Sequence, residues 1–350
     1  MRLLHLYRPT LPSTRAQAIQ VFRTCHALAV HGYEVTLLAN RGQESRDCWS
    51  IMGLKPHPNF HLKICPVGHS GLSGLWFRHR LSKWWAGSPG IVLARDQRRL
   101  LQAVKKHGKK GHRIILEIHG LDSLSKPDLP DAYRSEQQCL DIADGLVANC
   151  GGTLAAWRNA HNVRLPCVVS HNGTHVEAQA HSQTQDFILV LGSMRTFKGV
   201  KALLNAASAL PYEFRWVGGD TAERGQHRTP DHVKLMPPMP HGDIEALITQ
   251  ARVLVAPLGD NIFSHQLTSP LKMWDYLAAR RPIVTAETGC TAEIAQMTQT
   301  SFHLYTPEDE ASIQQALSTA WNAPERPSYR RNWTSRVHDI LPVLEAQPHA

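Results

Sequence analysis

Short runs of apolar and β-branched residues alternate along this chain with stretches of helical periodicity, and no other feature constrains the fold as strongly. Residues 91–94, 114–118 and 145–148 are such runs in the first half, and residues 251–256 and 283–286 are such runs in the second. Runs that are apolar on both faces are typical of parallel strands buried between helices. The sequence therefore predicts an α/β fold built on parallel sheets.

The length and the turn signals divide the chain into two domains. At 350 residues it is too long for most single hydrophobic cores, since domains commonly have about 100–200 residues. A turn signal at residues 171–174 and a polar connector precede a second series of strands and helices, which opens at residue 186. We expect an N-terminal domain over residues 1–176, a C-terminal domain over residues 177–325, and a final helical segment, 326–350, that packs back on the N-terminal domain.

The composition argues against several classes of protein. No apolar run approaches the roughly 20 residues that a membrane-spanning helix needs. The seven cysteines are scattered and include no CxxC pair, which argues against both a disulfide framework and a zinc site. We therefore expect a protein of the reducing cytoplasm.

A segment that mixes tryptophans with cations lies in the basic half of the chain. Residues 1–170 carry 23 Lys and Arg against 11 Asp and Glu, whereas the remainder carries 15 against 18. Residues 71–87 combine indole rings with positive charge, which is the composition of a helix lying on an anionic membrane surface. The predicted membrane contacts are Trp76, Arg78, Arg80, Lys83, Trp84 and Trp85. Burial of the tryptophans against the sheet is the alternative.

Residues 269–282 predict a helix whose start lies at the carboxyl edge of the second sheet. Ser269 is a preferred N-cap, and Pro270 suits the first helical position. The unpaired N–H groups of such a helix start can hold a phosphate, and Lys272 adds a positive charge beside them. Asp275, one turn further on, can accept hydrogen bonds from a ribose diol. The alternative is a capped core helix with an incidental acid.

Residues 192–199 form a second polar loop that follows a predicted strand. This loop carries two cations, Arg195 and Lys198, at the end of the strand. Because parallel strands end at the same edge of a sheet, the loop is directed at the same crevice as Ser269.

The first domain offers its own candidates at strand ends. Ser13, Thr14 and Arg15 precede a helix over residues 15–31 and can hold a phosphate or sugar hydroxyls, although the loop lacks the GxGxxG pattern of dinucleotide sites. An N-cap and a surface arginine are the alternative. His119 follows a predicted strand and is placed to enter a cleft, and a structural histidine is the alternative there.

Taken together, these motifs resemble those of the retaining, nucleotide-sugar-dependent glycosyltransferases of GT-B architecture, a large family that includes bacterial mannosyl- and glucosyltransferases of cell-envelope and polysaccharide assembly. The similarity extends over nearly the whole chain. The places that carry it are residues 269–279 with 282–284, Gly192-Ser193 with Lys198-Gly199-Val200, Glu117-Ile118-His119, and His171-Asn172-Gly173.

The resemblance implies two Rossmann-like domains that face a cleft, with the donor on the second domain and the acceptor on the first. The implied reaction moves a hexose-type sugar from a UDP- or GDP-sugar to a glycan, a lipid-linked or a small-molecule acceptor with retention of configuration. It implies no metal and no cofactor, a cytoplasmic enzyme that is peripheral on the inner face of the membrane, and no nucleic-acid partner.

The resemblance also assigns roles to residues. Lys198 and Arg195 would neutralise the donor diphosphate, and His119 would lie near the sugar as an orienting or proton-shuttling group. The donor site as a whole would comprise Gly192, Ser193, Arg195, Lys198, Ser269, Pro270, Leu271, Lys272 and Asp275. Many relatives carry a glutamate where this chain has Leu267, so Asp260 and His265 become the nearest polar candidates for sugar contacts.

Two other functions compete with this interpretation. A sugar-nucleotide epimerase would share the phosphate-binding residues but needs acid and base side chains around the sugar, for which only Glu117 and Asp122 offer themselves. A basic nucleic-acid-binding protein is suggested by the pI of ≈ 9.3, but the sequence contains no recognised nucleic-acid-binding motif.

Overall fold

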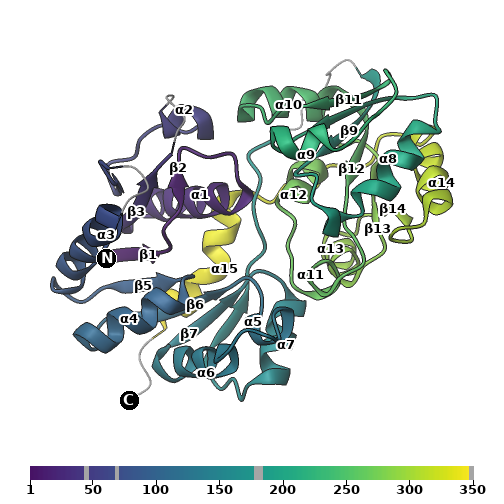
Figure 1. The fold of residues 1–350 in the computed structure, drawn as a ribbon. Coiled ribbons are helices and arrows are strands. Elements are labelled where there is room, and N and C mark those ends of the chain that lie inside the picture. The colour runs from purple at the N-terminus through teal and green to yellow at the C-terminus, as the bar shows by residue number, and fades with distance from the viewer. Residues whose placement is uncertain (43–46, 68–70, 177–183, 347–350) are drawn as a thin grey trace. The chain divides into compact units, whose positions relative to one another are not determined.

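The computed structural model describes residues 1–42, 47–67, 71–176 and 184–346. The chain forms two compact units, shown in Figure 1. The first unit comprises Met1–Asn172 together with Trp333–Ala350, and the second comprises Gly173–Asn332. Each unit contains one parallel sheet covered by helices, so the predicted fold of two Rossmann-like α/β domains is confirmed.

The sheet of the first unit has the strand order β2-β3-β1-β5-β6-β7-β8, with β4 paired to β3, and every strand pair is parallel. Strands β3 and β4 are added on one side of β1, and β5 and the strands that follow it are added on the other side. The order of the strands therefore reverses between β1 and β5. The strands are β1 (Arg2–Leu6), β2 (Thr10–Leu11), β3 (Glu34–Arg41), β4 (Phe60–Ile64), β5 (Ile91–Ala94), β6 (Arg113–Ile118), β7 (Gly145–Ala148) and β8 (Cys167–Val169).

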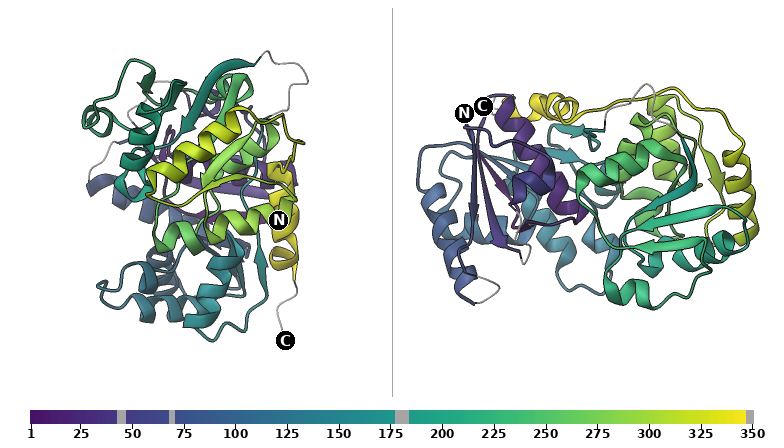
Figure 2. Two further views of the ribbon diagram at one scale, coloured as in Figure 1. Left: turned by 90° about the vertical axis from the view of Figure 1, so that its right-hand side faces the viewer. Right: turned by 90° about the horizontal axis from the view of Figure 1, so that it is seen from above.

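Helices cover both faces of this sheet. Helix α15, although it comes last in the chain, packs against α1, β7 and β8, and Figure 2 shows α1 and α15 on one side of the strands and α3 on the other. The helices are α1 (Ala16–Val30), α2 (Cys48–Met52), α3 (Gly71–Trp85), α4 (Gln97–His107), α5 (Asp122–Ser125), α6 (Ala132–Ile142), α7 (Gly151–Ala160) and α15 (Trp333–Glu345).

The sheet of the second unit has the strand order β11-β10-β9-β12-β13-β14, again with every pair parallel. Here the order of the strands reverses between β9 and β12. The strands are β9 (Gln185–Leu191), β10 (Glu213–Val217), β11 (Val233–Met236), β12 (Ala251–Ala256), β13 (Ile283–Ala286) and β14 (His303–Tyr305). The helices are η1 (Thr196–Lys198), α8 (Val200–Ser208), α9 (Thr221–Gly225), α10 (His241–Gln250), α11 (Ile262–Gln266), α12 (Leu271–Ala278), α13 (Gly289–Thr298) and α14 (Glu310–Trp321).

The start of α12 differs from the predicted one. Pro270 is the N-cap residue, and no side chain caps the helix. The hydroxyl of Ser269 instead accepts a hydrogen bond from the indole Nε1 of Trp274 at 3.0 Å. The predicted N-cap role of Ser269 is therefore wrong, because the buried indole needs an acceptor and the serine supplies it.

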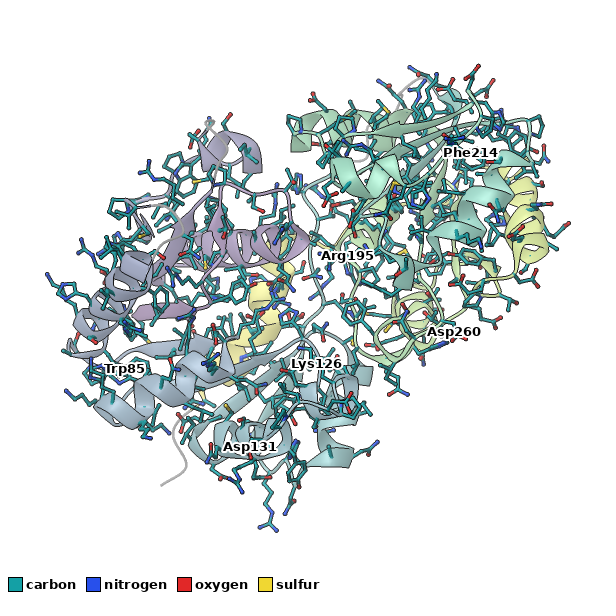
Figure 3. All side chains as sticks on the ribbon, viewed as in Figure 1. Trp85, Lys126, Asp131, Arg195, Phe214 and Asp260 are labelled. Atoms are coloured by element: carbon teal, nitrogen blue, oxygen red, sulfur yellow. The ribbon has the colours of Figure 1, made fainter. Side chains whose placement is uncertain are left out.

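The aromatic and basic segment forms α3, but its last two tryptophans belong to the core. Trp84 is 8% exposed and Trp85, labelled in Figure 3, is fully buried. Both rings pack against His112. The indole of Trp85 donates to the carbonyl of Gly108 at 2.9 Å. The prediction that Trp84 and Trp85 contact a membrane is therefore wrong, because both side chains fill the space between α3 and its neighbours.

The other predicted membrane contacts lie nearer the surface of α3. Arg78 and Lys83 are exposed, whereas Trp76 and Arg80 are half-buried. Among the described residues, no helix is long and apolar enough to cross a membrane. The seven cysteines are free thiols, six of which are buried.

Candidate active site

Two lysine ammonium groups meet beside Gly192, at the point where β9 ends. The Nζ atom of Lys198 donates to the hydroxyl of Ser193 at 2.9 Å, and Nζ of Lys272 donates to the carbonyl of Leu191 at 2.6 Å. A Cβ atom placed on Gly192, whose φ is +132°, would lie 3.1 Å from Nζ of Lys272 and 3.5 Å from Nζ of Lys198. The glycine therefore leaves open the space that both ammonium groups border.

The environment of these two lysines disfavours their charge. Burial lowers the pKa of Lys272 well below its ordinary value, and the charge of Lys198 lowers it further. Burial, followed by the charge of Arg195, also lowers the pKa of Lys198. Over the described ranges neither lysine has a carboxylate within ion-pair distance. Both side chains are half-buried, and the charge of Glu223 offsets part of the lowering at Lys198. Two half-buried cations without a paired carboxylate favour a multiply charged anion at this position.

The loops around the two lysines lie at the reversal of the strand order between β9 and β12, where open α/β sheets bind their ligands. The loop after β12 is held against the loop after β9, since the amide of Asn261 donates to the carbonyl of Phe197 at 2.7 Å. A Cβ atom on Gly259 would lie only 2.3 Å from that same carbonyl oxygen, so only glycine permits this approach. The helix start at Leu271 follows the same loop and is not capped by a side chain.

The structure turns Arg195 toward a carboxylate rather than toward the lysines. Its Nε atom lies 3.8 Å from Glu223, and the side chain is 60% exposed (Figure 3). Glu223 in turn completes the capping box of α9 with Asp220. Arg195 is therefore near the predicted diphosphate site, as its effect on Lys198 shows, but it is tied to α9.

Three predicted sugar and ribose residues have partners within the second unit. Asp275 is 9% exposed and accepts a hydrogen bond from the hydroxyl of Thr174. Asp260, which precedes α11 and is labelled in Figure 3, pairs with His265 on α11 at 2.8 Å. Leu267, at the position where many relatives carry a glutamate, is fully buried. The ribose and sugar contacts stay predictions.

In the first unit, His119 is the more exposed member of a hydrogen-bonded pair with Glu117, which belongs to a buried polar network. Its Nε2 atom lies 3.0 Å from Oε1 of Glu117, whose side chain is fully buried, whereas the side chain of His119 is 17% exposed. The same carboxylate accepts from the amide of Gln20 at 2.9 Å and from the guanidinium of Arg336 on α15. Nε2 of His5 lies 3.0 Å from its other oxygen.

This network fixes the protonation state of His119. Burial, followed by the charge of Arg95, lowers the pKa of His119 to about 4. Burial alone would raise the pKa of Glu117, but the interactions with His119 and His5 hold it well below its ordinary value. At neutral pH an ionised Glu117 thus accepts from the Nε2–H of a neutral imidazole. The Nδ1 atom is left as a hydrogen-bond acceptor.

The predicted loop before α1 lies on the surface of the first unit. Thr14 and Arg15 are exposed, and the hydroxyl of Ser13 accepts from the backbone N–H of Arg15 at 3.1 Å. No side chain caps α1. Of the alternative, the structure contains the surface arginine but not the side-chain N-cap, and the predicted contacts with a phosphate or a sugar stay predictions.

Several charged groups near these sites were missed by sequence reasoning. The pairing of Arg336 with Glu117 joins residues 219 positions apart, for which the sequence carries no local signal. Arg8 and Arg95 follow strands β1 and β5 directly, and the rule that located His119 would have located them too. Within the described ranges, no group of three or more His, Cys, Asp or Glu side chains is arranged to hold a metal ion.

Two family models match the chain over separate ranges. The model of Glycosyltransferase Family 4 matches residues 17–178, and the model of Glycosyl transferases group 1 matches residues 185–323. A sequence comparison with curated proteins finds no significant match.

Solved structures share the fold over nearly the full length. Sucrose-phosphate synthase from Thermosynechococcus elongatus has a TM-score of 0.70 at 16% identity, covering 98% of this chain and 94% of the synthase. HepE from Anabaena, solved with UDP and glucose, has a TM-score of 0.68 at 13% identity, covering 99% and 97%. WaaG, a glycosyltransferase involved in lipopolysaccharide biosynthesis, has a TM-score of 0.63 at 14% identity, covering 99% and 96%. The family models and the shared architecture together identify the chain as a glycosyltransferase of the GT-B class.

Proposed function

We propose that this enzyme transfers a hexose-type sugar from a UDP- or GDP-sugar to a glycan, lipid-linked or small-molecule acceptor, with retention of configuration and without a metal ion. The observation that carries the proposal is the convergence of Lys198 and Lys272 on Gly192, at the strand reversal and beside the uncapped start of α12. Two ammonium groups and a helix start match the charge of a diphosphate.

The chemistry follows from where charge develops. As the bond between the sugar and the diphosphate breaks, negative charge grows on the leaving oxygen and the sugar becomes oxocarbenium-like. Lys198 and Lys272 are fixed beside that oxygen and stabilise this state more than the bound donor, each contributing about 3 kcal/mol. These cations supply the positive charge that a metal ion supplies in other transferases.

His119 is proposed to act on the sugar or on the incoming hydroxyl. Its Nδ1 atom accepts a hydrogen bond, because Nε2–H is committed to Glu117. A neutral acceptor of this kind orients the attacking hydroxyl by accepting its hydrogen bond, and because the pKa of His119 is about 4, the proton of that hydroxyl passes instead to the leaving diphosphate oxygen on the same face of the sugar.

The relatives support the choice of donor. HepE was solved with UDP and glucose and also with UDP-glucose, at 13% identity to this chain. The second unit, which matches the group 1 model, contains the two lysines.

For its location we propose the cytoplasm, with peripheral contact to an anionic membrane through α3. The support is a pair of leucines, Leu72 and Leu75, which are 61% and 55% exposed, beside the exposed cations Arg78 and Lys83. Apolar side chains that project among cations suit a headgroup region.

The proposed function is tested by nucleotide binding and donor turnover. UDP, GDP and ADP are added separately to the purified protein, and the unfolding temperature is followed. A ligand at about 100 times its dissociation constant adds about 2.7 kcal/mol to the free energy of unfolding. Stabilisation by UDP or GDP, followed by acceptor-dependent loss of the matching nucleotide-sugar, supports the proposal.

Two outcomes would contradict it. Absence of stabilisation by UDP and GDP alike would remove the assigned donor site. Conversion of the nucleotide-sugar to an epimer without any acceptor would favour the epimerase function. The anomeric configuration of the transferred sugar, read by NMR, tests retention separately.

A further inference from the structure

The strand reversal of the first unit gathers arginines that the proposed function does not use. The order of the strands reverses between β1 and β5, as it does between β9 and β12 in the second unit. Arg8 follows β1, Arg95 follows β5, and Arg99 lies in the first turn of α4. Since ligands bind in open α/β sheets at such reversals, these side chains occupy the corresponding position of the first unit.

Arg8 and Arg99 come together on one aromatic ring. The guanidinium carbon of Arg8 lies 5.1 Å from the ring centroid of Phe77, and that of Arg99 lies 4.8 Å from it. Phe77 is buried in α3, so its ring fixes both guanidinium groups from a third element. Burial, followed by the charge of Arg99, lowers the pKa of Arg8. The two cations are therefore close enough to repel each other.

The described residues supply one carboxylate for these two cations. Nε of Arg99 lies 2.7 Å from a carboxylate oxygen of Asp96. The Nε and Nη2 atoms of Arg8 are shielded from solvent and have no hydrogen-bond partner in the part of the chain that the structure describes. A guanidinium that is shielded without acceptors costs free energy, which an anion bound to it would recover.

The third arginine adds to the positive field at this edge. The guanidinium of Arg95 lies 5.1 Å from the ring centroid of Tyr7 and donates to Gln20. Glu117, the carboxylate whose charge acts on Arg95, already accepts from Arg336. The edge formed by β1 and β5 thus carries more positive than negative charge on its described side chains.

We propose that Arg8 and Arg99 bind a phosphate group of the acceptor substrate. Two guanidinium groups match the several oxygens and the charge of about −2 of a phosphate, whereas a single carboxylate needs only one guanidinium. The proposal rests on the proposed function, because it names the substrate class that the first unit receives.

The position of His119 sets the size of this acceptor. His119 follows β6, which is the neighbour of β5 on the side away from β1. Neighbouring strands are about 4.8 Å apart, so a phosphate at β1 and β5 lies roughly one to two strand spacings, or about 5–10 Å, from His119. A phosphorylated sugar or a phosphorylated polyol headgroup spans that distance.

The test measures phosphate binding by calorimetry on protein saturated with UDP, so that the diphosphate site in the second unit is filled. Inorganic phosphate and glucose 6-phosphate are the soluble probes, and phosphatidylcholine vesicles with and without phosphatidic acid are the lipid probe. Arg8→Gln should weaken binding of the phosphate probes at least tenfold. Arg98→Gln, which changes the exposed arginine beside Arg99 on α4, should leave it unchanged.

Further variants keep the test decisive. Arg8→Lys retains the charge but not the paired N–H donors and should bind with intermediate affinity, and Arg99→Gln should weaken binding as Arg8→Gln does. Equal affinity of the unaltered protein and Arg8→Gln for both soluble probes would overturn the proposal. If the unaltered protein does not bind UDP at all, the result counts against the proposed function instead, because the proposed UDP site consists of residues of the second unit and includes neither Arg8 nor Arg99. Tighter binding of glucose 6-phosphate would identify the acceptor as a soluble phosphate ester. Tighter binding of the vesicles that contain phosphatidic acid would identify it as a phospholipid.

Discussion

The Nε2 atom of His119 lies 3.0 Å from a carboxylate oxygen of Glu117, and this contact leaves Nδ1 as the ring nitrogen that can accept a hydrogen bond. Glu117 is in turn held by Arg336, which α15 brings back to the first unit from the end of the chain. The carboxylate therefore positions the histidine, and the C-terminal helix positions the carboxylate.

Glu117→Gln should lower kcat at least tenfold, because an amide can donate to Nε2 as readily as it accepts from it and no longer selects one tautomer. The ¹⁵N chemical shifts of the His119 ring distinguish the two tautomers directly. Glu117→Asp retains the charge and should restore part of the activity. An unchanged pattern of ring shifts in Glu117→Gln would show that the carboxylate does not set the tautomer.

The buried imidazole should make the free energy of unfolding depend on pH. The pKa of His119 is about 4 in the folded chain, against an ordinary value of 6.5. The unfolded chain therefore binds more protons between these values, and stability is lost as the pH falls from 6.5 toward 4.

This loss should amount to about 2–3 kcal/mol by pH 4.5, measured by chemical denaturation. His119→Gln, which keeps a donor for Glu117, should show a correspondingly flatter profile. His79→Gln, an exposed histidine on α3, should follow the unaltered protein. Parallel profiles for all three proteins would contradict the lowered pKa.

Lys272→Met should abolish stabilisation by UDP and reduce transfer at least a hundredfold, because it removes one of the two cations at Gly192. The same change relieves the buried charge, so the protein without ligand should unfold at an equal or higher temperature. Lys201→Met, on the exposed surface of α8, is the matched control and should alter neither property. Retained UDP stabilisation in Lys272→Met would remove this lysine from the donor site.

Substitutions on α3 should distinguish side chains that stabilise the core from side chains that contact a membrane. Trp85→Ala should lower the free energy of unfolding by about 3–5 kcal/mol, since a fully buried indole and its hydrogen bond to Gly108 are lost. Leu72→Ser with Leu75→Ser should leave stability nearly unchanged and weaken sedimentation with anionic vesicles. Undiminished sedimentation of the double variant would exclude these leucines from membrane contact.

The loops of the proposed donor site were predictable because they depend on local pattern. Strands buried on both faces are uniformly apolar, so their carboxyl ends can be found in the sequence. Lys198 lies in the segment after β9, and Lys272 lies in the first helical turn after the segment that follows β12. The carboxyl ends of parallel strands lie at one edge of the sheet, so residues in the loops that follow these strands lie near one another however the helices pack on the sheet. The family resemblance named the same loops, and the family models confirm the glycosyltransferase assignment.

Side-chain partners were less predictable because they are chosen in three dimensions. Ser269 has the composition of an N-cap, yet a buried indole competes for its hydroxyl. Trp84 and Trp85 have the composition of a membrane-surface helix, yet the packing of α3 buries them. In each case the sequence states what a residue can do, and the neighbours determine which interaction forms.

By itself, the sequence determined two parallel α/β domains, the strand ends that carry polar groups, and the excess of cations in the first half of the chain. Only the tertiary structure decided that Arg336 holds Glu117, that Trp84 and Trp85 are buried, and that Arg8 and Arg99 share Phe77. The physical reason is that burial and charge pairing act over a few ångströms in space between residues far apart in the chain. The periodicity that predicts strands and helices acts only between close neighbours in sequence.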